Sequence, residues 1–265
     1  MQRKWALVAS LTFFSVIIIS GVVFFFLRST REPVYQGKPL SVWLKGYDLV
    51  KSNNTTVVDV AVWRATDKIV QQAGTNAIPT LLRLLREEDV RKLNVGVNGQ
   101  EASMGFVALR ANAKDAIPSL MEIYEQNPAA RVDAIYCLSC IGPAAEEAIP
   151  WLLKNLSNTN GDVRAGIISA LGEIHSKTAL VVPVLINCLD ETNRRVRVDA
   201  ALALSSYRTD AKPAIPKLVE LLNDKGKGIS NSAVLAIKMI DPEAAAKAGL
   251  KPTPQPPPIA PPVSP

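Results

Sequence analysis

Two cysteines three positions apart are the residues of this chain that most readily suggest chemistry. Cys137 and Cys140 form a Cys-x-x-Cys motif, a spacing that serves redox chemistry or zinc binding in other proteins. The motif falls inside a predicted helix, not at a helix N-terminus, where a thiolate would be stabilised. Cys188 has no second Cys-x-x-Cys motif with which to complete a metal site. We therefore predict that the cysteines pack in the fold and form no disulfide framework.

Histidine chemistry is equally limited. His175 is the only histidine among 265 residues, which excludes a metal site built from several histidines. It lies at the end of a predicted helix, where we expect it to face solvent or to cap the helix. The sequence contains no catalytic constellation that we can identify, so we predict no catalytic residue, no cofactor, no bound metal and no enzymatic activity.

A repeated Ala-Ile-Pro-x-Leu motif indicates the elements that position these residues. Apolar residues stand one before, two after and six after each proline, and this spacing places them on one face of a helix. A proline is tolerated only in the first turn of a helix, so each motif predicts a helix start. The prolines recur at nearly equal intervals, of which the first is the longest: Pro79, Pro118, Pro150, Pro183 and Pro216. Such a period, made of helices, predicts a solenoid.

A second helix follows each proline helix with the same period. Small residues recur every 33 positions, at Cys137, Ala170, Ala203 and Ala236. A small residue where two helices cross permits close approach, and the leucine or isoleucine that follows it fills the seam. Cys137 is thus predicted to be a packing residue. The helix pairs are predicted near residues 76–112, 115–142, 145–174, 178–207 and 211–240.

The second helices resemble those of HEAT repeats. Residues 163–172 and 196–204 resemble the pattern V-R-x-x-A-x-x-A-L-G, with Ile167 in place of the first alanine, and the proline motif resembles the first helix of such a repeat. The resemblance covers about residues 57–241. It implies an all-α, right-handed solenoid of about six helix pairs, whose helical surface binds protein partners. It also implies that the charged residues of the second helices form an interaction face or a ladder between repeats: Arg131, Asp133, Arg164, Arg197 and Asp199.

Two groups of enzymes also have HEAT-like repeats. Deoxyhypusine hydroxylases bind di-iron through several His-Glu pairs, and this chain has none. Bilin lyases share similar repeats, but no residue here matches a bilin-handling motif. A bilin-lyase-like enzyme or enzyme accessory subunit therefore remains the alternative on fold alone, and a bound chromophore would distinguish it from a scaffold.

A hydrophobic run precedes the repeats. Residues 5–27 carry no charge over 23 positions, a length of about 35 Å as a helix, enough to span a hydrocarbon core of roughly 30 Å. Arg3 and Lys4 precede the run, and Arg28 and Arg31 follow it. A cleavable signal peptide would have a shorter apolar core and a small-x-small site. We therefore predict an uncleaved signal anchor and a single-pass membrane protein.

The orientation of this anchor depends on its flanks, whose charges are nearly balanced. A very short basic N-terminus usually stays in the cytoplasm. We therefore expect a cytoplasmic N-terminus and repeats on the extracytoplasmic, periplasmic side, with the reverse orientation as the alternative.

The positive net charge of +6 does not indicate a nucleic-acid partner. Thirty basic residues oppose 24 acidic ones, and four of the basic residues flank the hydrophobic run. Beyond position 31 the balance is therefore 26 to 24, whereas nucleic-acid-binding domains usually concentrate positive charge. We predict no nucleic acid as partner.

The remaining segments are caps, an insertion and a tail. A stripe of apolar residues at Leu40, Trp43, Leu44 and Tyr47 predicts a divergent capping helix, followed by a loop at residues 51–56 and a helix near 57–72. Residues 87–101 form an insertion. A proline-rich tail follows Leu250 and favours an extended conformation. The predicted segments are a membrane anchor, a linker with a capping helix, the solenoid, and a short helical end with a disordered tail: 1–31, 32–56, 57–241 and 242–265.

Overall fold

The computed structural model describes residues 32–47, 50–52, 55–57, 59–91 and 100–251. They belong to two compact units, one ending at Ser119 and the other beginning at Leu120. Apart from two short hairpins, the described residues form an all-α fold whose helices pack in HEAT-like pairs. None of the helices in these ranges is long and apolar enough to cross a membrane. The predicted anchor at residues 5–27 and the proline-rich tail from residue 252 lie outside the described residues.

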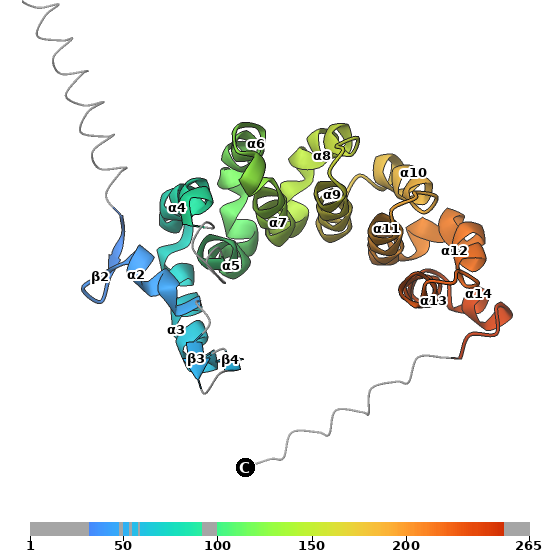
Figure 1. Cartoon of the computed structure of the whole chain (residues 1–265), viewed down its shortest axis with the longest axis horizontal. Helices are drawn as coiled ribbons and strands as arrows, with labels where there is room; N and C mark the ends of the chain where they lie inside the picture. The colour runs from blue at the N-terminus through green and yellow to red at the C-terminus, as the bar shows by residue number, and fades with distance from the viewer. Residues whose placement is uncertain (1–31, 48–49, 53–54, 58, 92–99, 252–265) are drawn as a thin grey trace, which may run out of the picture. The chain divides into compact units, whose positions relative to one another are not determined.

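The first unit combines two hairpins with helices. Its elements, blue to green in Figure 1, are β1 (Val34–Tyr35), β2 (Lys38–Pro39), α2 (Leu40–Leu44), the 3-10 helix η1 (Lys45–Tyr47), β3 (Val50–Ser52), β4 (Thr55–Val57), α3 (Val60–Ala73), η2 (Gly74–Ala77), α4 (Ile78–Arg91), α5 (Gln100–Leu109) and η3 (Arg110–Ala116). Helix α6 (Ile117–Gln126) spans the boundary between the units. The predicted insertion therefore contains the end of α4 and the start of α5, with residues 92–99 outside the described ranges.

The predicted capping helix is present, but hairpins flank it. Leu40, Leu44 and Tyr47 are fully buried, and the Tyr47 hydroxyl donates a hydrogen bond to Asp67 of α3 at 2.6 Å. The β1–β2 hairpin turns at Gln36 and Gly37, whose φ angles of 49° and 76° suit a tight turn with two left-handed residues. The loop prediction for residues 51–56 was wrong, because β3 and β4 pair there in an antiparallel ladder.

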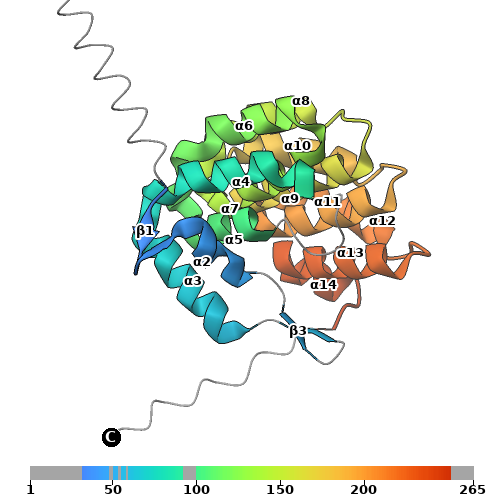
Figure 2. The same cartoon turned by 60° about the vertical axis from the view of Figure 1, so that its left-hand side comes forward.

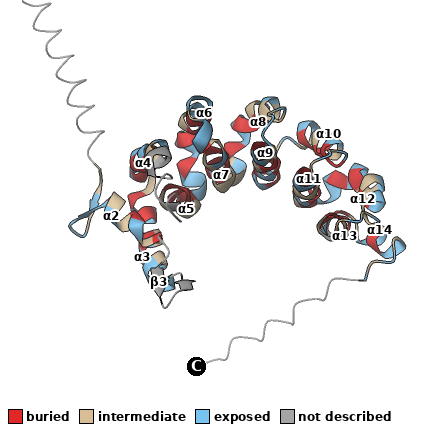
Figure 3. Cartoon of the chain, in the orientation of Figure 1, coloured by how far each residue is buried: buried red, intermediate tan, exposed pale blue. Residues whose placement is uncertain are grey.

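The second unit consists of helices in two layers. They are α7 (Arg131–Ile141), α8 (Ile149–Asn155), α9 (Gly161–Ile174), α10 (Thr178–Cys188), α11 (Arg194–Ser206), α12 (Ile215–Leu221), α13 (Lys227–Ile240) and α14 (Pro242–Lys247), joined in part by the 3-10 helices η4 (Pro128–Ala130), η5 (Gly142–Ala148) and η6 (Arg208–Ala214). Figures 1 and 2 show α8, α10 and α12 in one layer and α7, α9, α11 and α13 in the other. Each of these helices contains buried residues, which are coloured red in Figure 3.

The repeat register predicts this core correctly. The four small residues of the second helices are at most 4% exposed: Cys137, Ala170, Ala203 and Ala236. The four apolar residues after them are fully buried: Leu138, Leu171, Leu204 and Ile237. Each second helix thus buries the same face against its neighbours, as nearest-neighbour packing in a repeat protein requires.

Asparagines at the same period fix where these helices begin. The side chains of Asn160 and Asn193 each accept hydrogen bonds from two backbone N–H groups in the first turn, in α9 and α11. Asn127 caps the 3-10 turn ahead of α7, where its side chain accepts a hydrogen bond from one backbone N–H, that of Ala129. Such caps stabilise a helix end by about 1 kcal/mol. The regular spacing of Asn127, Asn160 and Asn193 is present in the sequence.

The proline rule holds in four of the five motifs. Pro79, Pro118, Pro150 and Pro216 are each the second residue of a helix that begins with isoleucine. For Pro183 the prediction was wrong, since α10 begins well before the proline, at Thr178.

Local backbone geometry explains the early start of α10. His175 and Lys177 both adopt left-handed conformations, with φ of 46° and 47°. Left-handed residues also stand at the equivalent positions Gly142 and Arg208, ahead of ordinary 3-10 segments. Among the described proline helices, a second left-handed residue, Lys177, occurs only before α10, where a helical turn replaces the 3-10 segment. Pro183 lacks an N–H and cannot donate the usual helical hydrogen bond to the carbonyl of Ala179. Since Ala179 is exposed, water can take the place of this donor.

Candidate functional site

The cysteines occupy packing positions. Cys137 is fully buried and Cys188 is 6% exposed, as predicted, and Cys140 is half-buried. Burial raises the pKa of Cys188 to about 11, so its thiol stays protonated at neutral pH and is a poor nucleophile. Within the described ranges, no three His, Cys, Asp or Glu residues are grouped to hold a metal ion.

His175 caps a helix and faces solvent, as predicted. It is the left-handed C-cap of α9, and its backbone N–H donates to the carbonyl of Leu171 at 3.2 Å. Its exposed ring packs edge-on against Tyr207, with 4.9 Å between ring centroids. The Tyr207 hydroxyl in turn donates to the Leu171 carbonyl at 2.8 Å. The surroundings of His175 are therefore structural.

Two of the predicted arginines connect successive repeats. Arg164 donates to the carbonyl of Asn158 in the loop before its own helix, and it pairs with Glu191 of the next repeat at 3.4 Å. Arg197 repeats this arrangement with the Glu191 carbonyl at 2.8 Å and with the Asp224 carboxylate at 3.4 Å. The two acids stand at equivalent positions of their repeats. The arginines thus join the loops of neighbouring repeats.

Arg131 differs because a neutral residue stands where the others find an acid. Asn158 occupies the equivalent position in the loop after Arg131, and it donates to the Tyr124 hydroxyl at 3.2 Å. Arg131 donates to the Tyr124 carbonyl at 3.1 Å, and its guanidinium lies 5.1 Å from the centre of the Tyr124 ring. Aromatic stacking replaces the ion pair here.

The predicted aspartates belong to a different surface. Asp199 pairs with Arg195 at 3.8 Å, not with Arg197, because residues two apart on a helix do not face each other. Arg195 also pairs with Asp162 of the preceding repeat at 2.9 Å. Asp133 lies half-buried on α7, at the position that corresponds to Gly166 on α9 and Asp199 on α11. Asp133 and Asp199 are thus in register with each other on the exposed side of the second helices.

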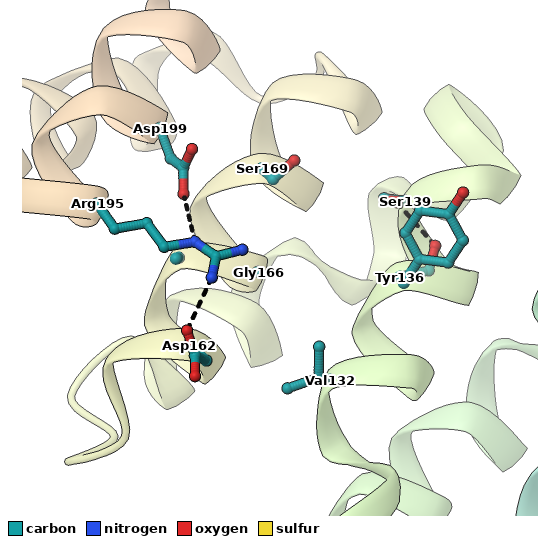
Figure 4. A pocket seen from close by; sticks show the side chains of 9 residues that line it. Val132, Tyr136, Ser139, Asp162, Gly166, Ser169, Arg195 and Asp199 are labelled. Atoms are coloured by element: carbon teal, nitrogen blue, oxygen red, sulfur yellow. Dashed lines mark hydrogen bonds and ion pairs between the residues drawn. The ribbon is translucent and has the colours of Figure 1, made fainter. Parts of the chain in front are cut away.

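A groove of about 340 Å³ lies across α7, α9 and α11. Helix α9 forms its floor with the small residues Ala165, Gly166 and Ser169. Tyr136 on α7 and Arg195 on α11 stand on opposite sides of it (Figure 4). The complete lining is Val132, Tyr136, Ser139, Asp162, Ala165, Gly166, Ser169, Arg195 and Asp199. The groove exists because α9 has small side chains where α7 has Val132 and Tyr136 at the corresponding positions.

The ionisable side chains of the groove carry a net negative charge. Arg195 is the one basic side chain of its lining, and it contacts both acidic side chains, Asp162 and Asp199. Burial raises the pKa of Asp199, while the nearby Arg195 lowers it. Burial also raises the pKa of Tyr136, and Cys140 adds to the shift. Tyr136 is therefore a neutral phenol at physiological pH. The two aspartates and one arginine of the lining leave the groove with one net negative charge.

Large apolar side chains extend from this groove along the same face. Tyr136 is 47% exposed, Leu202 38% and Leu235 42%, and they stand at equivalent positions of α7, α11 and α13, with Ser169 of α9 between them. We call these four residues the exposed stripe. Sequence reasoning missed it, although the signal was available: each residue immediately precedes the buried small residue of its repeat.

A known repeat family matches part of this chain. Residues 149–238 match HEAT repeats. The matched segment runs from the start of α8 into α13 and contains the floor of the groove and its α11 side. The crystal structure of an engineered protein is similar to the chain, with 18% sequence identity, a TM-score of 0.44, and coverage of 80% of this chain and 98% of that chain. No curated protein matches the chain.

Proposed function

We propose that this protein is a membrane-tethered, non-enzymatic scaffold that binds another protein along the exposed stripe and the groove beside it. HEAT repeats generally mediate protein–protein interaction, and solenoids offer extended binding surfaces. The single observation that carries the proposal is the exposed stripe, in which Tyr136, Leu202 and Leu235 remain open to solvent at one register.

The energetics favour a protein partner for this face. Removing the exposed parts of these side chains from water contributes roughly 1 kcal/mol each, and the groove adds a place for a projecting side chain. Tyrosine is also among the residues enriched in protein interfaces. Contacts distributed over three repeats suit a protein segment better than a compact small molecule.

Photo-crosslinking tests this proposal. A photoreactive amino acid replaces Leu202 in the full chain, produced in its own cells, and the matched control replaces Val219 on α12. Both side chains are 38% exposed, but Val219 belongs to the other helix layer. We expect position 202 to yield a defined protein adduct, identified by mass spectrometry, and position 219 to yield none. Equal labelling from both positions, or adducts from position 219 alone, would place the binding face elsewhere.

The tether in this proposal rests on the hydrophobic run at residues 5–27. Its length, its lack of charge and the basic residues on both sides favour a signal anchor. With a cytoplasmic N-terminus, the repeats lie on the extracytoplasmic side, and their partner is found there.

A protease experiment measures this topology. The protein should resist extraction by alkaline carbonate, and protease added after the outer barrier is opened should digest the repeats while the inner membrane stays intact. The control is a known outer-side protein digested in the same sample. Protection of an epitope at the C-terminus would reverse the orientation, and release by carbonate would contradict the anchor.

A further inference from the structure

The groove across α7, α9 and α11 has chemistry that narrows the choice of partner. We propose that it receives an arginine side chain projecting from a partner protein, with Asp162 accepting hydrogen bonds from the guanidinium and Tyr136 stacking on it. This inference rests on the proposed function, because it names the side chain that the binding face selects.

The carboxylates give the groove its preference for a cation. Arg195 contacts the Oδ1 atom of Asp162, and the Asp162 side chain is still 66% exposed, so its carboxylate is accessible to a ligand. Arg195 itself is held by Asp162 and Asp199 together, at 2.9 Å and 3.8 Å. One negative charge is therefore left over, and a cationic side chain would neutralise it.

The backbone at the start of α9 does not offset this preference for a cation. The first N–H groups of α9 are a potential anion site, but the side chain of Asn160 already accepts from the N–H groups of Asp162 and Val163, at 2.8 Å and 3.3 Å. An anionic ligand would therefore meet the excess negative charge of the groove, while the N–H groups of Asp162 and Val163 are already occupied.

Tyr136 favours arginine over lysine. Its ring stands across the groove from the carboxylates (Figure 4) and is 47% exposed. A guanidinium is planar, stacks on aromatic faces and donates in two directions at once, whereas an ammonium is a compact and strongly hydrated charge. The same unit already contains such a pair, because the guanidinium of Arg131 lies over the ring of Tyr124.

The size of the groove suits one long side chain. Its volume of about 340 Å³ lies at the lower end of the range of roughly 300–1,000 Å³ for small-molecule sites. The floor has room because Gly166 has no side chain. A Cβ atom added at Gly166 would meet only Ile135, at 3.6 Å, so the site accepts a larger residue whose outer atoms would occupy the hollow.

Peptide binding tests the inference. Two fluorescent pentapeptides, Leu-Gly-Arg-Gly-Leu and its citrulline counterpart, are titrated into the full chain in detergent micelles, and fluorescence anisotropy is recorded. Citrulline keeps the shape of arginine without its charge. We expect the arginine peptide to bind at least tenfold more tightly, and this advantage to fall as the salt concentration rises.

Variants of the chain locate the binding. Asp162→Asn should reduce the advantage of arginine at least fivefold, and Tyr136→Ala and Gly166→Leu should weaken binding of the arginine peptide to a similar degree. The matched control is Asp190→Asn, which removes a carboxylate of similar exposure, 62% against 66%, beyond the end of α10 in the other layer. Circular dichroism verifies that each variant is folded.

Three results would overturn the inference. Equal binding of the arginine and citrulline peptides would refute it, while a specific adduct from position 202 would leave the scaffold proposal intact. Equal loss in Asp162→Asn and Asp190→Asn would show that net charge alone acts. If truncation after Lys251 increased the binding of both peptides equally, the chain's own tail would be the occupant.

Discussion

Replacing Leu171 with aspartate should lower the free energy of unfolding by roughly 4 kcal/mol or more, enough to unfold a protein of ordinary stability. Leu171 is fully buried in α9, and its carbonyl accepts hydrogen bonds from His175 and Tyr207. The substitution removes an apolar contact and buries a carboxylate without a partner, which is costly in the protein interior.

Chemical denaturation of residues 32–265, followed by circular dichroism, measures this effect. Leu202→Asp is the matched control, since it makes the same change on α11 at a side chain that is 38% exposed, and it should cost less than about 1 kcal/mol. Similar losses for the two variants would mean that Leu171 does not lie in the seam between the repeats.

Gly172→Ala should destabilise the second unit by about 1–3 kcal/mol, the usual cost of overpacking, although alanine is the better helix former. A Cβ atom at Gly172 would lie 2.8 Å from the Cα atom and 2.9 Å from the Cβ atom of Ala203 on α11. A backbone atom cannot rotate away as a flexible side chain can. The two helices would have to separate, and the contacts along both repeats would loosen.

Gly166→Ala in the same helix should have the opposite sign. Its new Cβ atom meets only the Ile135 side chain at an ordinary 3.6 Å, so the gain in helix propensity, about 0.5–1 kcal/mol, remains. Thermal unfolding of both variants decides the matter. A gain in stability from both would show that α9 and α11 are not in close contact at Gly172.

Much of the fold could be predicted because its rules are local. Pro118 and Pro150 specify helix starts through the geometry of a single residue. The register of Ala170 and Leu171 follows from the helical turn and from the constant period of the repeats. Where the prediction failed, a competing local effect was stronger. The left-handed Lys177 before α10 moved the helix start away from Pro183, and residues 50–52 paired with residues 55–57 instead of lying in a loop.

The candidate site was predictable only in part. The arginines were recognised by their repeat positions, but the assignment of acid partners required distances between repeats. Arg197 finds Asp224 of the following repeat, and Asp199 finds Arg195 on its own helix. The acids paired with Arg164 and Arg197 lie in loops, and no helical period connects a loop residue to a helix in another repeat.

The sequence by itself determined that this chain repeats, where four of its five proline-marked helices start, and which small residues recur at the crossings. Only the tertiary structure decided what each small residue does. Gly172 lies against the backbone of α11, whereas Gly166 opens a groove to solvent. The two glycines lie in the same helix, and their roles differ because the packing of α7 and α11 against α9 brings a neighbouring backbone to one and leaves the other uncovered. The groove is a property of three helices from successive repeats, and its shape depends on distances that no local pattern contains.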